Sequence, residues 1–297
     1  MGESNLHALS IDIQSLLTFN FPDRYAQNGN MFSKRMAAIR KSCGKDVELV
    51  FIDGPHLLRP ADLVWSSTSE LGASEASDSD PAIAPRAWWR VNTERTQALG
   101  LDASLALLKD VLKADRYEGV FGFSQGAAFA ALLAALLEKP HLYPSFLIDG
   151  QSPHPPFKFC VSVSGFKPPD QLATILMSPS YSTPTLHVLG KNDVIVIEEW
   201  SKVLLEISAN KRIEEHDGGH FVPCKANWRN FFRDYLLDPL RDVPSPGLSS
   251  SSTPNFGATH AQSIEYTGIN IPRNTVNGVS STRQRARIFE TFSAPPA

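Results

Sequence analysis

Residues 117–137, YEGVFGFSQGAAFAALLAALL, join a short apolar segment to an alanine- and leucine-rich segment through a glycine-flanked serine. The apolar segment favours a buried strand and the residues from Gln125 onward favour a helix, so a Gly-x-Ser-x-Gly pattern stands at a strand-to-helix turn. Gly122 and Gly126 carry no Cβ, which lets the strand and the helix approach closely around Ser124. The segment therefore predicts an α/β architecture with a serine held on a sharp turn.

Strand-like and helix-like segments alternate on both sides of this turn. Such alternation predicts a mostly parallel sheet that is covered by helices on both faces. The expected strands are residues 47–53, 117–123, 157–166, 184–193 and 212–216, and the expected helices are residues 31–43, 93–114 with a break near 100–102, 125–139, 200–209 and 225–237.

Three zones along the chain differ in character. Residues 1–24 form an atypical N-terminal segment, in which residues 16–21 resemble a short strand that Pro22 soon interrupts. Residues 25–242 are expected to form the folded α/β domain. Residues 243–297 are rich in Ser, Pro and Gly and carry too few apolar side chains to offset chain entropy, so this tail is expected to be disordered.

Composition limits the class of function. The chain has 297 residues, of which 42% are hydrophobic, and a net charge of −3, values that are ordinary for a soluble globular protein. This charge gives no case for binding nucleic acid or an anionic membrane, and no apolar stretch reaches the roughly 18 residues of a membrane span. The three widely spaced cysteines match neither a disulfide framework nor a zinc site. With no signal-peptide pattern, a cytoplasmic location without nucleic-acid or membrane partners is expected.

Ser124 stands where a serine nucleophile would be activated by the start of a helix. Backbone N–H groups at a helix N-terminus point toward negative charge, and the N–H of Gln125 is placed to donate to an oxyanion that forms at the serine. The simpler alternative is a serine that only caps the helix. The choice depends on whether the chain supplies a general base and an acid.

Histidine candidates for the base lie near the end of the expected domain. His220 follows two glycines in HDGGHFVPC, and such a loop can bring an imidazole over the serine. His216 competes with it but ends a strand-like segment, where it faces core or solvent. His187 lies inside an apolar strand and is expected to pack in the core.

The acid that orients the histidine is expected between the serine and the histidine along the chain. Asp193 comes at the end of the expected strand 184–193, and functional side chains gather at the carboxyl ends of strands in open α/β sheets. Asp170, in an expected surface turn, and Asp217, very near the base in sequence, are the alternatives. Ser124, Asp193 and His220 are therefore the predicted catalytic residues.

Seven stretches of the sequence, taken together, resemble one known family. They occur in the family's order between Tyr25 and about Leu237: YAQNGNMFSKRMAAIRK, VELVFIDGPH, RAWWR, YEGVFGFSQGAA, PPFKFCVSVSGF, PTLHVLGKNDVIV and HDGGHFVP. The sequence is similar to the FSH-type serine hydrolases, a branch of the α/β-hydrolases that includes fungal polyketide-releasing thioesterases. The resemblance implies an α/β-hydrolase fold, the same catalytic Ser124, Asp193 and His220, and no cofactor or metal.

The resemblance also implies a reaction. A carboxylic ester or thioester would be cleaved through an acyl-enzyme, and the acyl group would be a polyketide or fatty-acyl chain, free or bound to a carrier protein. Trp88, Trp89 and Phe166 are expected either to line the acyl pocket or to pack in the core. Acyl-protein thioesterases share the GFSQG turn but lack the DGPH, RAWW and SGF set, which makes them the second expectation. A hydrolase fold that serves only for binding is the third.

One stretch departs from the family's pattern. The family has Leu-His-Gly-Tyr before Thr-Gln-Asn-Gly, whereas here YAQNG is preceded by FPDRY, so Asp23 and Arg24 stand in the place of His-Gly. In the family that loop supplies the second oxyanion donor. Tyr25 or a neighbour is therefore the expected partner of the Gln125 N–H.

Overall fold

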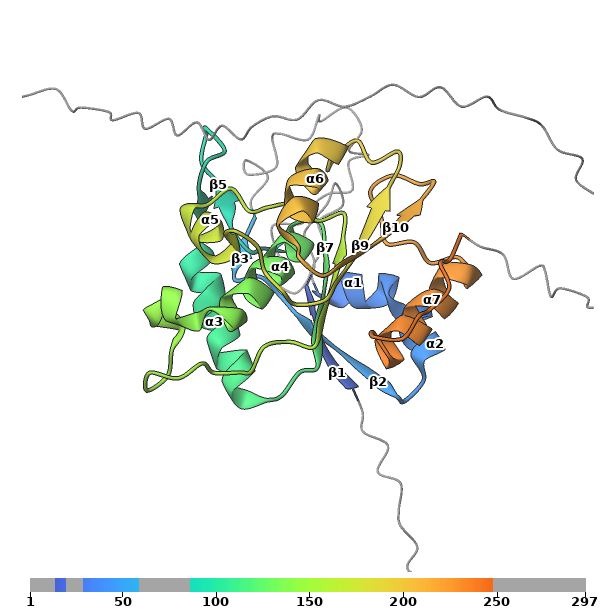
Figure 1. Cartoon of the computed structure of the whole chain (residues 1–297), viewed down its shortest axis with the longest axis horizontal. Coiled ribbons are helices and arrows are strands. Elements are labelled where there is room, and N and C mark those ends of the chain that lie inside the picture. The colour runs from blue at the N-terminus through green and yellow to red at the C-terminus, as the bar shows by residue number, and fades with distance from the viewer. Residues whose placement is uncertain (1–13, 20–28, 59–85, 248–297) are drawn as a thin grey trace, which may run out of the picture. The chain divides into compact units, whose positions relative to one another are not determined.

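A parallel sheet of six strands runs through the structure, a computed structural model that describes residues 14–19, 29–58 and 86–247, all within the unit formed by residues 1–251. The strand order is β10-β9-β8-β7-β1-β2 (Figure 1), and every neighbouring pair is parallel. The strands are β1 (Gln14–Phe19), β2 (Val47–Ile52), β7 (Gly119–Phe123), β8 (Phe159–Val163), β9 (Thr185–Gly190) and β10 (Lys211–His216).

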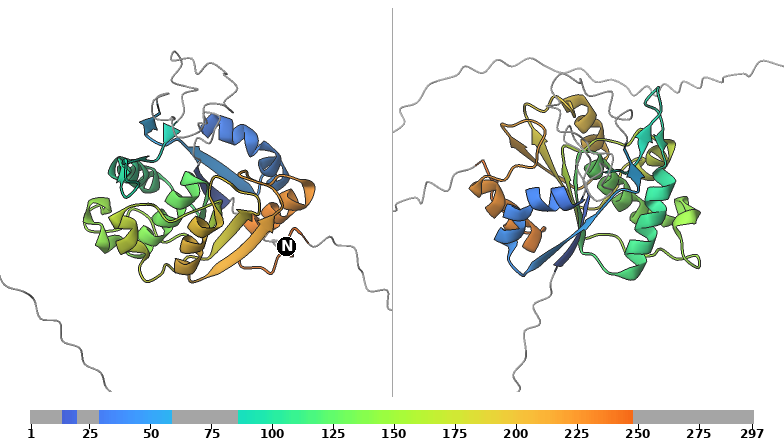
Figure 2. Two further views of the ribbon diagram at one scale, coloured as in Figure 1. Left: turned by 90° about the horizontal axis from the view of Figure 1, so that it is seen from above. Right: turned by 180° about the vertical axis from the view of Figure 1, so that it is seen from behind.

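Helices cover both faces of this sheet (Figure 2). Two buried apolar clusters assign the helices to the two faces. One cluster contains residues of α3, α4, α5 and α6, and the other contains residues of α1, α2 and α7. The predicted parallel sheet with helices on both faces is confirmed. The helices are α1 (Gly29–Arg35), α2 (Ala37–Cys43), α3 (Leu101–Ala114), α4 (Gln125–Glu138), α5 (Gln171–Met177), α6 (Glu198–Ile207) and α7 (Ala226–Leu237), with short 3-10 helices η2 (Pro140–Leu142) and η3 (Pro144–Phe146).

Alternation along the inner strands sends side chains to the two clusters in turn. In β7, Val120 packs on the α4 side, whereas Phe121 and Phe123 pack on the α7 side. A strand that is buried on both faces reads as a continuous apolar run, which explains the run in residues 117–123. Among the described residues, no helix combines the length and the apolar character that crossing a membrane requires.

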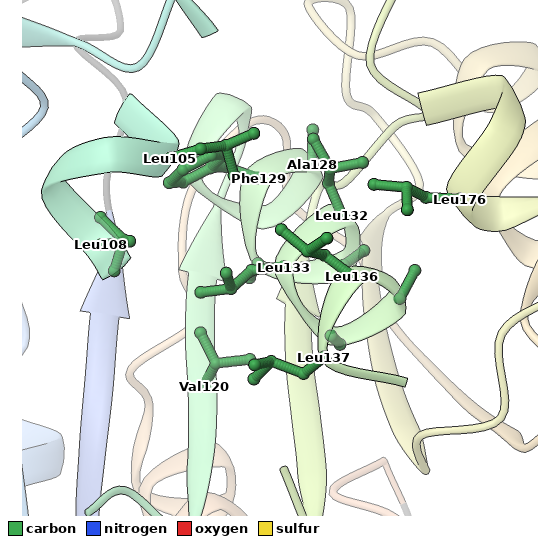
Figure 3. Packing of buried hydrophobic residues seen from close by; sticks show 14 of the residues in the cluster. Leu105, Leu108, Val120, Ala128, Phe129, Leu132, Leu133, Leu136, Leu137 and Leu176 are labelled. Atoms are coloured by element: carbon green, nitrogen blue, oxygen red, sulfur yellow. The ribbon is translucent and has the colours of Figure 1, made fainter. Parts of the chain in front are cut away.

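The helix that follows the serine is apolar on all sides because it lies inside the protein. Every residue of α4 from Gln125 to Leu137 is buried. Figure 3 shows Phe129 and the leucines of α4 in one buried cluster with Leu105 and Leu108 of α3, Val120 of β7 and Leu176 of α5. A helix without a polar face is stable only in such a place. The helix thus anchors the turn at its N-terminus in the middle of the core.

The prediction of helix before residue 100 is wrong. A short antiparallel hairpin of β5 (Arg90–Val91) and β6 (Ala98–Leu99) occupies this region, and upstream of it β3 (His56–Leu57) pairs antiparallel with β4 (Arg86–Ala87). The Asn92 side chain closes the β5–β6 hairpin by accepting the N–H groups of Thr96 and Gln97. Asn side chains compete in this way with helical hydrogen bonding. The expected helix 31–43 is present as α1 and α2, which meet at Met36.

The strand β1 lies upstream of the expected domain boundary at residue 25. It is hydrogen-bonded to β2 on one side and to β7 on the other, and it therefore belongs to the middle of the sheet. Residues 16–19 of the weak strand pattern therefore belong to an interior strand, and residues 20 and 21 lie outside the described residues.

Packing also continues beyond the expected end of the domain at residue 242. Val243 is buried against the α7 side of the sheet. Ser245 Oγ donates to Glu214, and the Asn227 side chain donates to the carbonyl of Pro246. These contacts explain why the polar composition from residue 243 does not mark the edge of the domain. Residues 248–297 lie outside the described residues, so their expected disorder stays a prediction.

Candidate active site

Ser124 lies on a sharp turn between β7 and α4. Its backbone has φ 55° and ψ −121°, a conformation that costs a residue with a Cβ about 1–3 kcal/mol. The Ser124 N–H donates to the carbonyl of Val163 at the end of β8, at 2.9 Å. A Cβ on Gly122 would stand 2.3 Å from the carbonyl oxygen of Gly126, so only glycine fits there. The turn is therefore held in its strained form by the packing of strand against helix.

A chain of two hydrogen bonds joins the three residues that the sequence singled out. His220 Nε2 lies 3.0 Å from Ser124 Oγ, and His220 Nδ1 lies 2.8 Å from Asp193 Oδ2. The side chains of His220 and Asp193 are only 5% and 4% exposed. The Phe123 ring packs against the imidazole with 4.8 Å between ring centroids. Such a chain lets a serine give its proton to an imidazole that a carboxylate holds in place.

The Asp193 carboxylate is fixed from two sides. Its Oδ2 faces His220, and its Oδ1 accepts the backbone N–H groups of Ile195 and Val196 at 3.0 and 2.9 Å. Burial by itself would raise the pKa of this carboxyl, but the hydrogen bond from His220 and the charge of that ring outweigh burial and hold the pKa below its usual range. Asp193 is therefore ionised at neutral pH.

Two loops meet to bring Asp193 and His220 together. The loop after β9 carries Asp193, and the loop after β10 carries His220. The Asn192 N–H donates to the carbonyl of Gly218, and its side-chain amide donates to the carbonyl of Asp217. A Cβ on Gly190 would lie 2.4 Å from the carbonyl oxygen of Gly219, so the close approach of the loops depends on glycine. A Cβ on Gly219 would lie 3.1 Å from the carbonyl oxygen of Asn192, so the glycine directly before His220 also lies at this close approach.

The competing histidines lie elsewhere. His216 is buried between Phe221 and Trp228, accepts the N–H of Gly218, and has its pKa lowered by burial. His187 is buried within β9, where burial lowers its pKa to about 3. Neither contacts Ser124 through a hydrogen bond of the described residues.

The competing aspartates also have other partners. Asp170 caps the start of α5, where its carboxylate accepts the N–H of Leu172, and it also accepts the N–H of Ala98. Asp217 is 90% exposed and pairs with Lys191 at 2.8 Å. Both carboxylates are occupied away from His220.

Gln125 has a structural role that the sequence did not reveal. Its side-chain oxygen accepts the N–H of Trp88, and its side-chain nitrogen donates to the carbonyl of Trp89. Its own backbone N–H is the first of α4, which has no acceptor within the helix. Ser104 Oγ also donates to the carbonyl of Trp88. No local sequence signal connects positions 88 and 125.

The tryptophans pack in the core, which was the simpler of the two expectations for them. Trp88 and Trp89 are buried, and Trp88 stacks on Phe129 of α4 with 4.5 Å between ring centroids. Phe166 links this group to the surface, since its ring contacts Trp89 on one side and Trp200 on the other. Tyr25, expected near the oxyanion, lies outside the described residues, as do Asp23 and Arg24.

Exposed apolar side chains follow two of the three hydrogen-bonded residues along the sequence. Val194 and Phe221 directly follow Asp193 and His220 and are 75% and 46% exposed. Two cavities among the described residues, of about 560 and 300 Å³, are lined by none of these three residues. Among the described residues, no cluster of three His, Cys, Asp or Glu side chains could hold a metal ion.

Comparisons with known proteins find several that this chain resembles. Esterase OVCA2 of Danio rerio is 33% identical over 224 residues, which cover 71% of this chain and 92% of that protein. An esterase of Aedes aegypti is 32% identical over 73% of this chain and 74% of that protein. SOBER1 of Arabidopsis thaliana, a solved structure, is 14% identical with a TM-score of 0.46, over 77% of this chain and all of that chain.

The match to a family profile decides the classification. The profile described as "Serine hydrolase (FSH1)" matches residues 25–232, which include the strained serine turn and both loops that meet beside it. The parallel sheet, the helices on both of its faces and the serine turn between β7 and α4 form an α/β-hydrolase fold. The chain belongs to the FSH1 family of serine hydrolases.

Proposed function

We propose that this protein hydrolyses carboxylic esters and thioesters through an acyl-enzyme, with Ser124 as nucleophile, His220 as general base and Asp193 as the orienting acid. The single observation that supports this most is the hydrogen-bond chain from Asp193 Oδ2 through His220 to Ser124 Oγ, at 2.8 and 3.0 Å. The names of the two relatives above, both esterases, add to this support.

The first half of the reaction forms the acyl-enzyme. Asp193 accepts the Nδ1–H of His220, which leaves Nε2 free to take the proton of Ser124 as Oγ attacks the carbonyl carbon. The Gln125 N–H donates to the oxyanion of the tetrahedral intermediate. His220 then gives its proton from Nε2 to the departing alcohol or thiol, and the carbonyl bond re-forms on Ser124.

The second half regenerates the enzyme. Water loses a proton to His220 Nε2 as it attacks the acyl carbon, and the new tetrahedral intermediate is again held by the Gln125 N–H. Collapse of this intermediate releases the acid and returns the proton from His220 to Ser124 Oγ. The second oxyanion donor is assigned, as a proposal, to Tyr25 or a neighbouring backbone N–H.

The substrate is proposed to carry an apolar acyl chain. Val194, Ile197, Trp200 and Val203 recur every third residue from the loop after Asp193 into α6, and all four are exposed. Ser201 Oγ donates to the carbonyl of Gly165, which holds α6 at the carboxyl end of β8, near the serine turn. An acyl chain attached to Ser124 would cover this stripe and remove apolar surface from water.

A polyketide or fatty-acyl group fits this chemistry, and a thioester to a carrier protein is one form in which it could arrive. The test is hydrolysis of p-nitrophenyl esters and acyl thioesters of graded chain length by the purified full chain. Turnover that improves with chain length is expected. No turnover of any ester or thioester would contradict the proposed function.

Trp200→Ser is expected to weaken binding of long acyl chains selectively. The change removes apolar area from the exposed stripe, so KM for a ten-carbon ester should rise about tenfold while KM for the acetyl ester stays within twofold. Steady-state kinetics on both esters measure this. Leu240→Ser is the control, because Leu240 is also an exposed apolar residue but lies beyond α7. An unchanged KM for the long ester in Trp200→Ser would contradict the assignment of the stripe.

A further inference from the structure

A second strained serine lies beside the first. Ser164 directly follows β8 and has φ 50°, in the left-handed region that disfavours residues with a Cβ. Its N–H donates to the carbonyl of Val188 in β9, just as the Ser124 N–H donates to Val163 in β8. The two serines thus end neighbouring strands in the same way. The reaction described above uses Ser124 and leaves Ser164 without a role.

The Ser164 side chain is buried, and its hydroxyl has no hydrogen-bond partner among the described residues. The residue is 1% exposed, and its Oγ is closed to solvent and has no hydrogen-bond partner of ordinary geometry among the described residues. Burying a hydroxyl without a partner costs about 1–3 kcal/mol, and the strained backbone adds to that cost. A hydroxyl hydrogen rotates freely about its C–O bond, so the group can turn toward any acceptor that comes within reach.

The acceptor with spare capacity is the Asp193 carboxylate. A carboxylate offers about four lone-pair positions, two on each oxygen. On Oδ1 both are used, by the N–H groups of Ile195 and Val196, whereas Oδ2 receives only His220 Nδ1 from the described part of the chain. The Ser164 hydroxyl also acts on Asp193. It is among the groups that lower the pKa of this carboxyl against the effect of burial, although His220 lowers it more.

We propose that Ser164 is a positioning residue whose hydroxyl donates to the open lone pair of Asp193 Oδ2. The bond fixes the rotation of the carboxylate about its own axis, and with it the direction in which Oδ2 meets His220. It also holds the negative charge in place when His220 becomes an imidazolium. The inference rests on the proposed function, since Asp193 must orient His220 for the bond to affect the reaction.

The test compares variants of Ser164, which directly follows β8, with a variant inside β8. Ser164→Ala removes the hydroxyl and keeps the Cβ, and Ser164→Gly removes both the hydroxyl and the backbone strain. Ser162→Ala is the matched control, because Ser162 is equally buried in β8 and its Oγ also has no partner among the described residues, but it pairs across the sheet with Gly122 and His187. All are made in the full chain, and their thermal unfolding is recorded alongside.

The expected result is a loss in kcat that both Ser164 variants share. Losing one hydrogen bond to a charged group should lower kcat about tenfold while KM stays within twofold. The lowfield proton resonance of His220 Nδ1–H should move in both variants, and Ser162→Ala should match the wild type in kcat and in this resonance. Because Ser164→Gly relieves strain, its kcat should fall even though its thermal midpoint does not.

Two results would overturn the inference. One is a kcat for both Ser164 variants within twofold of Ser162→Ala, and the other is an unmoved His220 resonance. Failure of the proposed function is a separate outcome: the wild type would then turn over no ester at all. In that event the resonance alone decides whether Ser164 donates to Asp193.

Discussion

Replacing Ser124 with alanine should lower kcat for ester hydrolysis by about 10⁴-fold or more, with little change in stability. The variant keeps the strained turn, since alanine also carries a Cβ, and it keeps the contacts of α4 with the core. It loses only the atom that attacks the carbonyl. Residual hydrolysis would come from water activated by His220 and from the Gln125 N–H, which act without the nucleophile.

Steady-state turnover of the best ester, with thermal unfolding of the same sample, measures this effect. The thermal midpoint of Ser124→Ala should lie within a few degrees of the wild-type value, so loss of fold would not explain loss of activity. A variant that is folded and retains more than about one hundredth of wild-type kcat would show that Ser124 is not the nucleophile.

Replacing Asp193 with asparagine is expected to have the second large effect, a fall in kcat of about 10⁴-fold. The asparagine amide can turn its NH₂ toward His220 Nδ1, which then becomes the acceptor, so the ring proton moves to Nε2. In that tautomer Nε2 cannot take the proton of Ser124. The loss of kcat is therefore expected to come from the changed tautomer of the imidazole and not from changed packing of the loop.

Asp217→Asn is the control for this prediction. Asp217 lies three residues before His220, but it is exposed and pairs with Lys191. Its substitution should leave kcat within twofold of the wild type, because no proton of the reaction passes near it. A large loss of kcat in Asp217→Asn, with Asp193→Asn near wild type, would reverse the assignment of the acid.

The serine turn and its partners could be predicted because their signals are local. A glycine on each side of Ser124, a carboxylate at the end of a strand and a Gly-Gly-His loop each describe a short stretch of chain. Their order along the chain then fits a parallel sheet, whose strand ends meet at one edge. The structure brings Ser124, Asp193 and His220 within hydrogen-bond reach of one another there.

Features that depend on distant residues could not be predicted. The hairpin before α3 is closed by the Asn92 side chain, which overrides a helix-like pattern. The position of strand β1 between β2 and β7 is set by its pairing with both of them. The Gln125 side chain binds backbone groups at Trp88 and Trp89, more than thirty residues away. None of these contacts leaves a periodic pattern in its own segment.

The most direct test of the account is to label the full chain with a fluorophosphonate and to locate the adduct by peptide mass spectrometry. Such probes react with a serine that an adjacent base has activated. The expected result is one adduct per chain, on Ser124, that is absent from Ser124→Ala and strongly slowed in Asp193→Asn. An unlabelled wild-type protein, or an adduct on another residue such as Ser164, would contradict the claim that Ser124 is the activated nucleophile.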